Sequence, residues 1–186
     1  LISGANMSSS AGFQALLDLA AKTKTNLLPI PAEGDENPRQ SGIGFSLLGR
    51  RFIAPMGQVA EMLEVPASTR LPGVQPWVIG LANVRGRLLP LFDMAIFFGG
   101  AALGQRRQQR ALVVDNDTMY SGLVVDQAYG MQHFTSELYR ETVDDVPDAV
   151  APFVKGGYVD SSGVSWALFD MNAVASYPKF LNAALS

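Results

Sequence analysis

Apolar and polar positions alternate in short runs over most of this chain, but residues 1–41 follow a different pattern. Residues 11–28 predict one short amphipathic helix, because apolar side chains recur on one helix face: Phe13, Leu16, Leu17, Ala20 and Ala21. Residues 29–41 are rich in proline and acidic side chains and predict a linker. Residues 1–7 carry no Lys or Arg and no apolar core, so they are not a secretory signal; the part ahead of a native Met7 is interpreted as an expression-vector remnant.

From residue 42 onward the chain shows the short runs, cut by glycine, that are typical of small β-barrels. Pairs of runs separated by short turns predict hairpins: residues 43–48 with 51–55, 77–84 with 87–92, 111–115 with 119–125, and 153–159 with 164–169. Further strands are expected at residues 59–63 and 131–134. The pattern therefore predicts a mostly β protein with short helices.

An internal repeat underlies this pattern. The tetrapeptide Leu-Phe-Asp-Met at residues 91–94 recurs at residues 168–171, an offset of 168 − 91 = 77 positions. Three further positions match at the same offset: Gly80 with Gly157, Asn83 with Asp160, and Gly86 with Gly163. Each copy is preceded by an earlier hairpin, so the matches indicate a duplicated unit.

The duplication predicts two similar five-stranded β-barrels side by side within residues 42–186. The first barrel is expected at about residues 42–100, the second at about 108–170, and a C-terminal helix at about 171–185. The groove shared by the two barrels would be the natural binding surface.

Composition narrows the possible functions. The 186 residues include no cysteine and a single histidine, so disulfides, thiolate metal sites and a two-histidine metal site are excluded. Fourteen Lys and Arg against 17 Asp and Glu give a net charge of −3, which disfavours binding to a phosphate backbone. The most apolar stretch, residues 88–103, is interrupted by Asp93 and Gly99-Gly100 and is too short to span a membrane. We interpret the chain as cytoplasmic, without direct membrane insertion.

The candidate catalytic residues favour structural roles. Asp93 and Asp170 each stand between a strand and a helical run, where a carboxylate caps free backbone N–H groups. His133 lies in a predicted strand without a nucleophile motif or metal-ligand companions, so a structural or interface role is favoured. We therefore expect no metal site and no cofactor; from the residues alone an enzyme is not excluded, but it would have few catalytic side chains.

Arg85 stands out because it occupies a hairpin turn, where a small polar residue is usual. From the residues alone, a solubilising charge and an arginine anchor at a protein interface are equally acceptable readings. Val59 and Met62, which lie among acidic residues, are favoured as core positions, with an exposed edge as the alternative.

These residues carry a resemblance to the CheW family of bacterial chemosensory scaffold proteins. Residues 77–93 (Trp-Val-Ile-Gly-Leu-Ala-Asn-Val-Arg-Gly-Arg-Leu-Leu-Pro-Leu-Phe-Asp) resemble its central motif, and residues 122–126 (Gly-Leu-Val-Val-Asp) resemble its second-barrel motif. Ala82 and Val84 are mild departures from that pattern. Residues 42–45, 54–56 and 130–134 look most like adaptors of type IV pilus chemosensory systems.

The resemblance implies two SH3-like β-barrels, no catalysis and two partners. One partner is the regulatory domain of a CheA-type histidine kinase, and the other is the cytoplasmic tip of a methyl-accepting chemoreceptor. By position, the receptor-binding residues would be Arg85, Val59, Glu61, Met62 and Gly122, and the kinase-binding residue would be Gly80. This implies a cytoplasmic adaptor recruited to membrane-associated arrays that control twitching motility, and it shifts Val59 and Met62 towards the interface reading.

Two other functions stay open at this point. Small β-barrels also bind small molecules or nucleic acid, and the basic residues Arg106, Arg107 and Arg110 would suit the latter. A hydrolase that uses His133 is the least favoured hypothesis.

Overall fold

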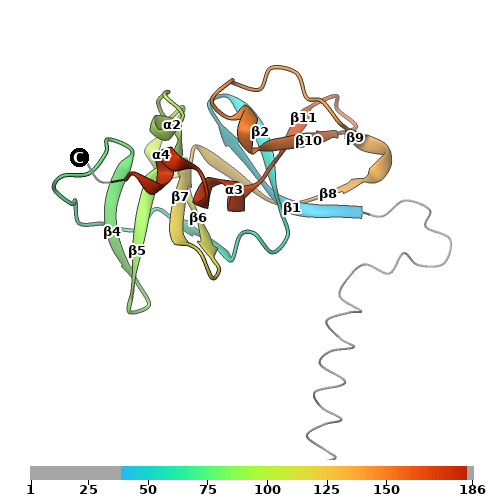
Figure 1. Ribbon diagram of the computed structural model, residues 1–186. Helices are drawn as coiled ribbons and strands as arrows, with labels where there is room; N and C mark the ends of the chain where they lie inside the picture. Colours follow the sequence, from blue (N-terminus) through green and yellow to red (C-terminus); the bar gives the residue numbers. More distant parts are fainter. Residues whose placement is uncertain (1–38, 184–186) are drawn as a thin grey trace, which may run out of the picture. The chain divides into compact units, whose positions relative to one another are not determined.

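The computed structural model describes residues 39–183, which contain two β-sheets (Figure 1). The described residues from 40 onward belong to one compact unit. The predicted tag remnant, the helix at 11–28 and nearly all of the linker lie outside the described residues. Within the described part, no helix is long and apolar enough to cross a membrane.

The first sheet, called sheet A, has six strands, one of them only two residues long. Their spatial order is β8 (Gln127–Thr135), β1 (Arg39–Leu47), β2 (Arg50–Pro55), β11 (Ser165–Phe169), β10 (Val154–Val159) and β9 (Tyr139–Arg140). Strands β1 and β2, like β10 and β11, form antiparallel hairpins, as the runs predicted. Strand β11 pairs with β2 in parallel.

The second sheet, called sheet B, has five strands. Their order is β3 (Glu61–Glu64), β6 (Arg110–Asp115), β7 (Tyr120–Val125), β5 (Arg87–Asp93) and β4 (Val78–Val84). Strands β4 and β5, and β6 and β7, form the other two predicted hairpins, and β5 pairs with β7 in parallel. The remaining elements are short: α2 (Met94–Phe97), η1 (Arg106–Gln108), η2 (Ser136–Leu138), η3 (Ala151–Phe153), α3 (Met171–Ala175) and α4 (Pro178–Leu181).

The sheets do not follow the expected division into consecutive barrels at about residues 42–100 and 108–170. The β1–β2 hairpin belongs to sheet A with strands from the second half, whereas β6–β7 belongs to sheet B with strands from the first half. Long-range packing accounts for this exchange, because the rings of Phe45 and Phe52 each lie 5.8 Å from the ring of Phe169 in β11. The two repeat units have therefore exchanged their first hairpins.

Despite this exchange the repeat is preserved in three dimensions. The order β3-β6-β7-β5-β4 of sheet B corresponds strand by strand to β8-β1-β2-β11-β10 of sheet A. Strand β4 is irregular between Val78 and Gly80, and β10 is irregular between Val154 and Gly157, at matching positions. The duplication read from the sequence thus corresponds to a structural repeat.

Both aspartates of the repeated tetrapeptide cap helices, as predicted. The Asp93 carboxylate accepts the N–H of Ile96 at 3.1 Å, and Asp170 accepts the N–H of Asn172 at 3.0 Å. The C-terminal helix expected at about 171–185 is instead two short helices, α3 and α4. Tyr177 is extended because the following Pro178 disfavours helical backbone at the residue before it.

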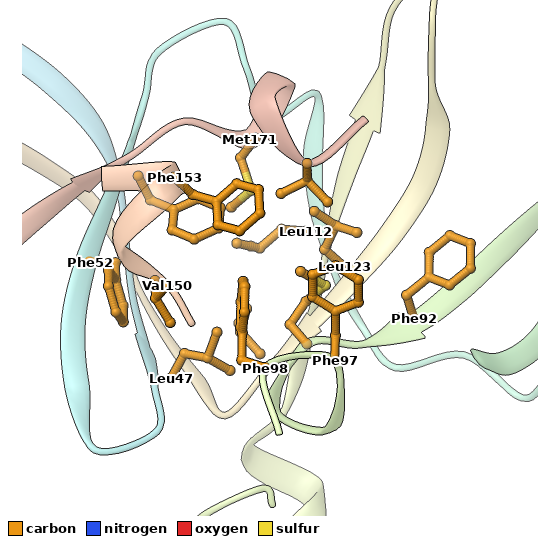
Figure 2. Packing of buried hydrophobic residues seen from close by; sticks show 14 of the residues in the cluster. Leu47, Phe52, Phe92, Phe97, Phe98, Leu112, Leu123, Val150, Phe153 and Met171 are labelled. Carbon is orange, nitrogen blue, oxygen red and sulfur yellow. The ribbon is translucent and has the colours of Figure 1, made fainter. Parts of the chain in front are cut away.

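The largest core lies between the two sheets and draws on both. Sheet A contributes Leu47 and Phe52, sheet B contributes Leu112 and Leu123, and helix α2 contributes Phe97 (Figure 2). Each sheet also has a smaller buried cluster of its own, around Leu89 and Leu91 in sheet B and around Ile53, Phe134 and Trp166 in sheet A. The shared groove expected between the barrels is therefore filled by side chains over this stretch.

Candidate partner-binding surface

The turn between β4 and β5 holds an arginine in an unusual backbone conformation. Arg85 has a φ of 52° and Gly86 a φ of 82°, so both residues of this two-residue loop lie in the left-handed region. Such a turn favours Asn-Gly, and a non-glycine residue there costs about 1 kcal/mol or more unless its side chain is suited to it. The turn is supported by Asn83, whose side-chain oxygen accepts the N–H of Gly86 at 3.0 Å. Arg85 therefore occupies a backbone conformation that its residue type does not favour, which directs attention to the contacts of its guanidinium.

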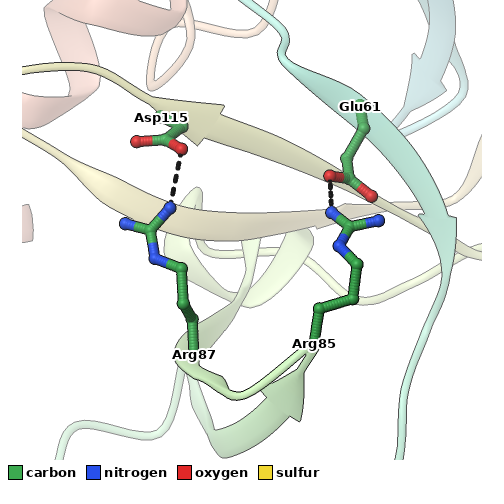
Figure 3. Close-up of polar contacts among 4 residues, drawn as sticks. All are labelled: Glu61, Arg85, Arg87 and Asp115. Atoms are coloured by element: carbon green, nitrogen blue, oxygen red, sulfur yellow. Dashed lines mark hydrogen bonds and ion pairs between the residues drawn. The ribbon is translucent and has the colours of Figure 1, made fainter.

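The Arg85 guanidinium donates a hydrogen bond to the carboxylate of Glu61 and forms an ion pair with it (Figure 3). This contact raises the pKa of Arg85 above its already high ordinary value, so the guanidinium stays charged. Glu61 begins β3, at the opposite edge of sheet B from β4, so the contact requires the sheet to curl. The side chain of Arg85 remains 71% exposed, and its other donors can reach a partner.

A second arginine holds the same turn from its other side. The guanidinium of Arg87 donates to Asp115 at 2.9 Å (Figure 3). It also lies 3.7 Å from the centre of the Tyr120 ring. Asp115 ends β6 and Tyr120 begins β7, so this contact ties the β4–β5 tip to the β6–β7 hairpin. Sequence reasoning assigned no role to Arg87 because its two partners are distant in the chain.

The predicted receptor-binding residues near β3 separate into two environments. Met62 is 41% exposed on β3, next to Glu61. Val59 is half-buried and packs against the core between the sheets. The structure therefore pairs Arg85 with Glu61, whereas Met62, the next residue of β3, points to the opposite face of that strand and Val59 packs on the core between the sheets.

Gly122 does not lie on this surface. It is buried in β7, where an added Cβ would stand 2.7 Å from a methyl carbon of Leu91 and 3.2 Å from one of Leu89. Gly122 is therefore too buried to contact a receptor directly. The glycine instead allows neighbouring leucines to fill the interior of sheet B.

Gly80, the predicted kinase-binding residue, is also buried. Its φ of 152° and its closeness to the Thr69 carbonyl, 2.3 Å from an added Cβ, leave no room for a side chain. Thr69 and Leu81 exchange backbone hydrogen bonds of 2.8 and 2.9 Å beside it. Gly80 therefore shapes the edge of sheet B by letting the loop at residues 65–76 lie against β4.

Comparison with known proteins identifies the architecture that carries this turn. The family profile described as "CheW-like domain" matches residues 41–179. The chain belongs to the CheW-like family. This confirms the resemblance seen in the hairpin at residues 77–93 and in the motif at residues 122–126.

Individual relatives agree with the family assignment. The chain is 40% identical to "Protein PilI" of Pseudomonas aeruginosa over 93% of this chain and 96% of the relative. It is 29% identical to "Chemotaxis protein CheW" of Helicobacter pylori over 59% of this chain and 64% of the relative. A crystal structure of the scaffolding protein TtCheW from Thermoanaerobacter tengcongensis has the same fold, with a TM-score of 0.61, 20% identity, and coverage of 72% of this chain and 90% of that chain. The predicted fold of two SH3-like β-barrels is confirmed.

His133, a candidate catalytic residue, has a side-chain partner in this CheW-like domain. His133 is exposed on β8, and its Nδ1 lies 2.6 Å from the hydroxyl of Ser41. Among residues 39–183, no group of three or more His, Asp or Glu side chains is placed to hold a metal ion. The neighbourhood of His133 agrees with its predicted structural role.

Asp126, which ends the second-barrel motif, joins the two sheets. Its carboxylate accepts the N–H of Leu48 at 3.2 Å, in the turn of the β1–β2 hairpin. Burial raises the pKa of the Asp126 carboxyl, while backbone hydrogen bonds from Leu103 and Leu48 oppose that rise. The last residue of this motif therefore links the end of β7 in sheet B to the β1–β2 turn of sheet A.

Proposed function

We propose that this protein is a non-catalytic adaptor that couples a methyl-accepting chemoreceptor to a CheA-type histidine kinase. The observation that carries the proposal is Arg85, charged and exposed at a left-handed turn, paired with Glu61 beside the exposed Met62. The likeness to PilI supports a chemosensory system that controls type IV pilus motility. The adaptor would act in the cytoplasm and be recruited to membrane-associated arrays by its receptor.

The receptor side follows from the geometry of the turn. A receptor tip is a helical hairpin, and one of its carboxylates can accept from Arg85 while its apolar side chains cover the outer face of β3, where Met62 is exposed. An exposed ion pair contributes only about 0–1 kcal/mol, so a partner carboxylate displaces Glu61 from Arg85 at little cost. Until a partner binds, Glu61 holds the guanidinium of Arg85 in position. Val59 and Gly122 would contribute indirectly, by supporting the core beneath.

The kinase side is proposed at the opposite edge of sheet B. Gly80 allows the loop at residues 65–76 to lie against β4, which presents that loop and the edge together. A side chain at Gly80 would push the loop away and change the surface offered to the kinase's regulatory domain. Receptor and kinase would then meet different parts of the same sheet.

The decisive experiment measures receptor-dependent kinase activity and binding of a receptor signalling fragment. Arg85→Glu reverses the charge, whereas Arg85→Asn keeps a residue that favours the left-handed turn and removes only the guanidinium. We expect Arg85→Glu to abolish coupling and Arg85→Asn to weaken receptor binding at least about tenfold, equivalent to ~1.4 kcal/mol.

Arg140→Glu is the matched control, because Arg140 is exposed on β9 of sheet A and donates to backbone carbonyls nearby. All three variants should keep the melting temperature of the wild type to within a few degrees. Normal coupling by folded Arg85→Glu and Arg85→Asn would refute the role of this turn.

A further inference from the structure

The segment at residues 178–183 belongs to the second repeat but packs beside sheet B. It follows β11 of sheet A and the helix α3, and it contains the short helix α4 (Figure 1). The ring of Phe180 lies 4.7 Å from that of Phe92 in β5 and 5.6 Å from that of Trp77. It also lies 5.8 Å from the ring of Phe97 in α2. Because Phe180 is only 8% exposed, it anchors the segment to these elements.

Two polar contacts hold the segment on either side of this anchor. The backbone N–H of Gln75 donates to the carbonyl of Ala183 at 2.8 Å. The ammonium of Lys179 donates to the carbonyl of Phe97, one of the last carbonyls of α2, which lack partners within the helix. Residues 178–183 are therefore fastened to the sheet B side at three places, and we call them the C-terminal strap.

The loop at residues 65–76 takes one of its attachments from this strap. Backbone hydrogen bonds between Thr69 and Leu81 hold the loop to β4, and the bond from Gln75 to the strap holds it nearer its end. Trp77, which follows the loop, stacks on Phe180 with an angle of 21° between the rings. Release of the strap would therefore loosen the Gln75 end of the loop and leave the Thr69 attachment in place.

The equivalent segment of the first repeat is packed differently. At the offset of 77 positions, Phe180 corresponds to Leu103, since 180 − 77 = 103. Leu103 is 55% exposed, and its backbone bonds to the carboxylate of Asp126. An aromatic anchor on the other repeat is thus a feature of the second copy, which the repeated fold by itself does not require.

We propose that the C-terminal strap positions the loop at residues 65–76 and thereby sets the affinity of this protein for its kinase. The assignment rests on the proposed function, which gives that loop to the kinase side, and it adds a conformational control by the second repeat. A single helical turn has little stability of its own, so docking of the strap depends on Phe180. A partner that requires the docked arrangement binds more weakly in proportion to the fraction of molecules that are docked.

Amide hydrogen exchange of the full chain, followed by NMR, tests the positioning directly. Phe180→Ala removes the anchor, and we expect the Gln75 amide to exchange at least about tenfold faster, equivalent to ~1.4 kcal/mol. Phe180→Leu keeps an apolar side chain and should restore most of the protection. Phe134→Ala is the matched control, because it removes a ring that is 4% exposed from the separate cluster of sheet A. It should leave the Gln75 amide as protected as in the wild type.

Titration calorimetry with the kinase's regulatory domain tests the consequence for binding. Phe180→Ala should bind this domain at least about fivefold more weakly and should bind a receptor signalling fragment like the wild type, because the Arg85 turn is held by Glu61. Phe134→Ala should bind both partners normally. Lys179→Met leaves the aromatic core intact and should show the same changes at about twofold, which keeps the proposal testable if Phe180→Ala does not fold.

The outcomes separate the possible failures. Unchanged exchange of the Gln75 amide in the folded strap variants would overturn the positioning role. Faster exchange with unchanged kinase binding would overturn the link to affinity. Equal losses in Phe180→Ala and Phe134→Ala would mean a general loss of stability and would also overturn the proposal. No kinase binding by the wild type would instead refute the kinase partnership, while the exchange measurement would still decide whether the strap positions the loop.

Discussion

The β4–β5 and β10–β11 hairpins are the same element of the repeat, built twice with different tips. Each carries an irregularity near its start, at Gly80 in one case and at Gly157 in the other. Each turn ends in a left-handed glycine, Gly86 with a φ of 82° and Gly163 with a φ of 80°. Their backbones and the capping aspartates that follow are thus closely alike.

The tips differ in their side chains and in their length. The β4–β5 loop consists only of Arg85 and Gly86. Arg85 pairs with Glu61 of β3, and Arg87, the first residue of β5, pairs with Asp115 of β6. The β10–β11 loop is longer, and Asp160 closes it by accepting the N–H groups of Ser162 and Val164. One tip extends charged groups towards neighbours and solvent, whereas the other bonds mainly to itself. A duplicated scaffold can therefore keep similar hairpins while only one of the two tips presents exposed arginine side chains.

The largest effect is expected inside the two sheets, at Gly122 and its counterpart Ile53. Both pair in parallel with equivalent leucines, Gly122 with Leu91 and Ile53 with Leu168. Because Gly122 has no room for a side chain, Gly122→Val should lower the free energy of unfolding by about 3 kcal/mol, whereas Ile53→Val should cost about 1 kcal/mol. Denaturant unfolding checks both values. A Gly122→Val variant of unchanged stability that no longer binds receptor would make Gly122 a contact residue instead.

A smaller effect is expected from the contacts that hold the arginine tip. Arg87→Met removes the ion pair with Asp115 and the cation–π contact with Tyr120. Together these contribute about 1 kcal/mol, so receptor binding should weaken roughly fivefold, less than for Arg85→Glu. Adding Asp115→Asn to Arg87→Met should cause little further loss, because the two side chains act as a pair. Full additivity of the two changes would show that Arg87 does not work through Asp115.

The smallest expected effect concerns the pH dependence of folding stability, which should differ between the two turns. Asp160 accepts from the indole N–H of Trp166 and from two backbone groups, which lowers the pKa of its carboxyl below 3.8. Because the pKa of Asp160 is lower in the folded state than its ordinary value of 3.8, the ionised carboxylate stabilises the folded protein at pH values above 3.8. This stability is lost as the pH falls through the lowered pKa of the folded state. Asp160→Asn introduces the neutral residue found at the equivalent position of the first repeat, Asn83. This variant should lack the loss of stability at acidic pH.

Thermal unfolding of the wild type and Asp160→Asn from about pH 5 to about pH 2 measures the effect. Asn83→Asp, the reciprocal exchange, is the matched variant for the other turn. An identical pH profile for wild type and Asp160→Asn would show that Asp160 contributes no such stability.

Most local features of this protein could be read from its sequence, although the single C-terminal helix expected at about 171–185 is two short helices and β9 was not predicted. The four hairpins, the capping roles of Asp93 and Asp170, the duplication and the unusual arginine turn follow from glycine placement, strand alternation and a repeated tetrapeptide. These features depend on residues close to one another in the chain, which is why pattern and turn chemistry are sufficient to find them. The family motif at residues 77–93 then pointed to the adaptor function.

Only the tertiary structure decided which hairpin joins which sheet and what each site residue does. The exchange of β1–β2 and β6–β7 depends on packing between residues about a hundred positions apart, such as Phe45 and Phe169. The same holds for the pairing of Arg85 with Glu61, the burial of Gly80 and Gly122, and the packing of Phe180 against Trp77. Local patterns specify elements but not their partners, because pairing energy comes from side chains that meet only once the chain is folded.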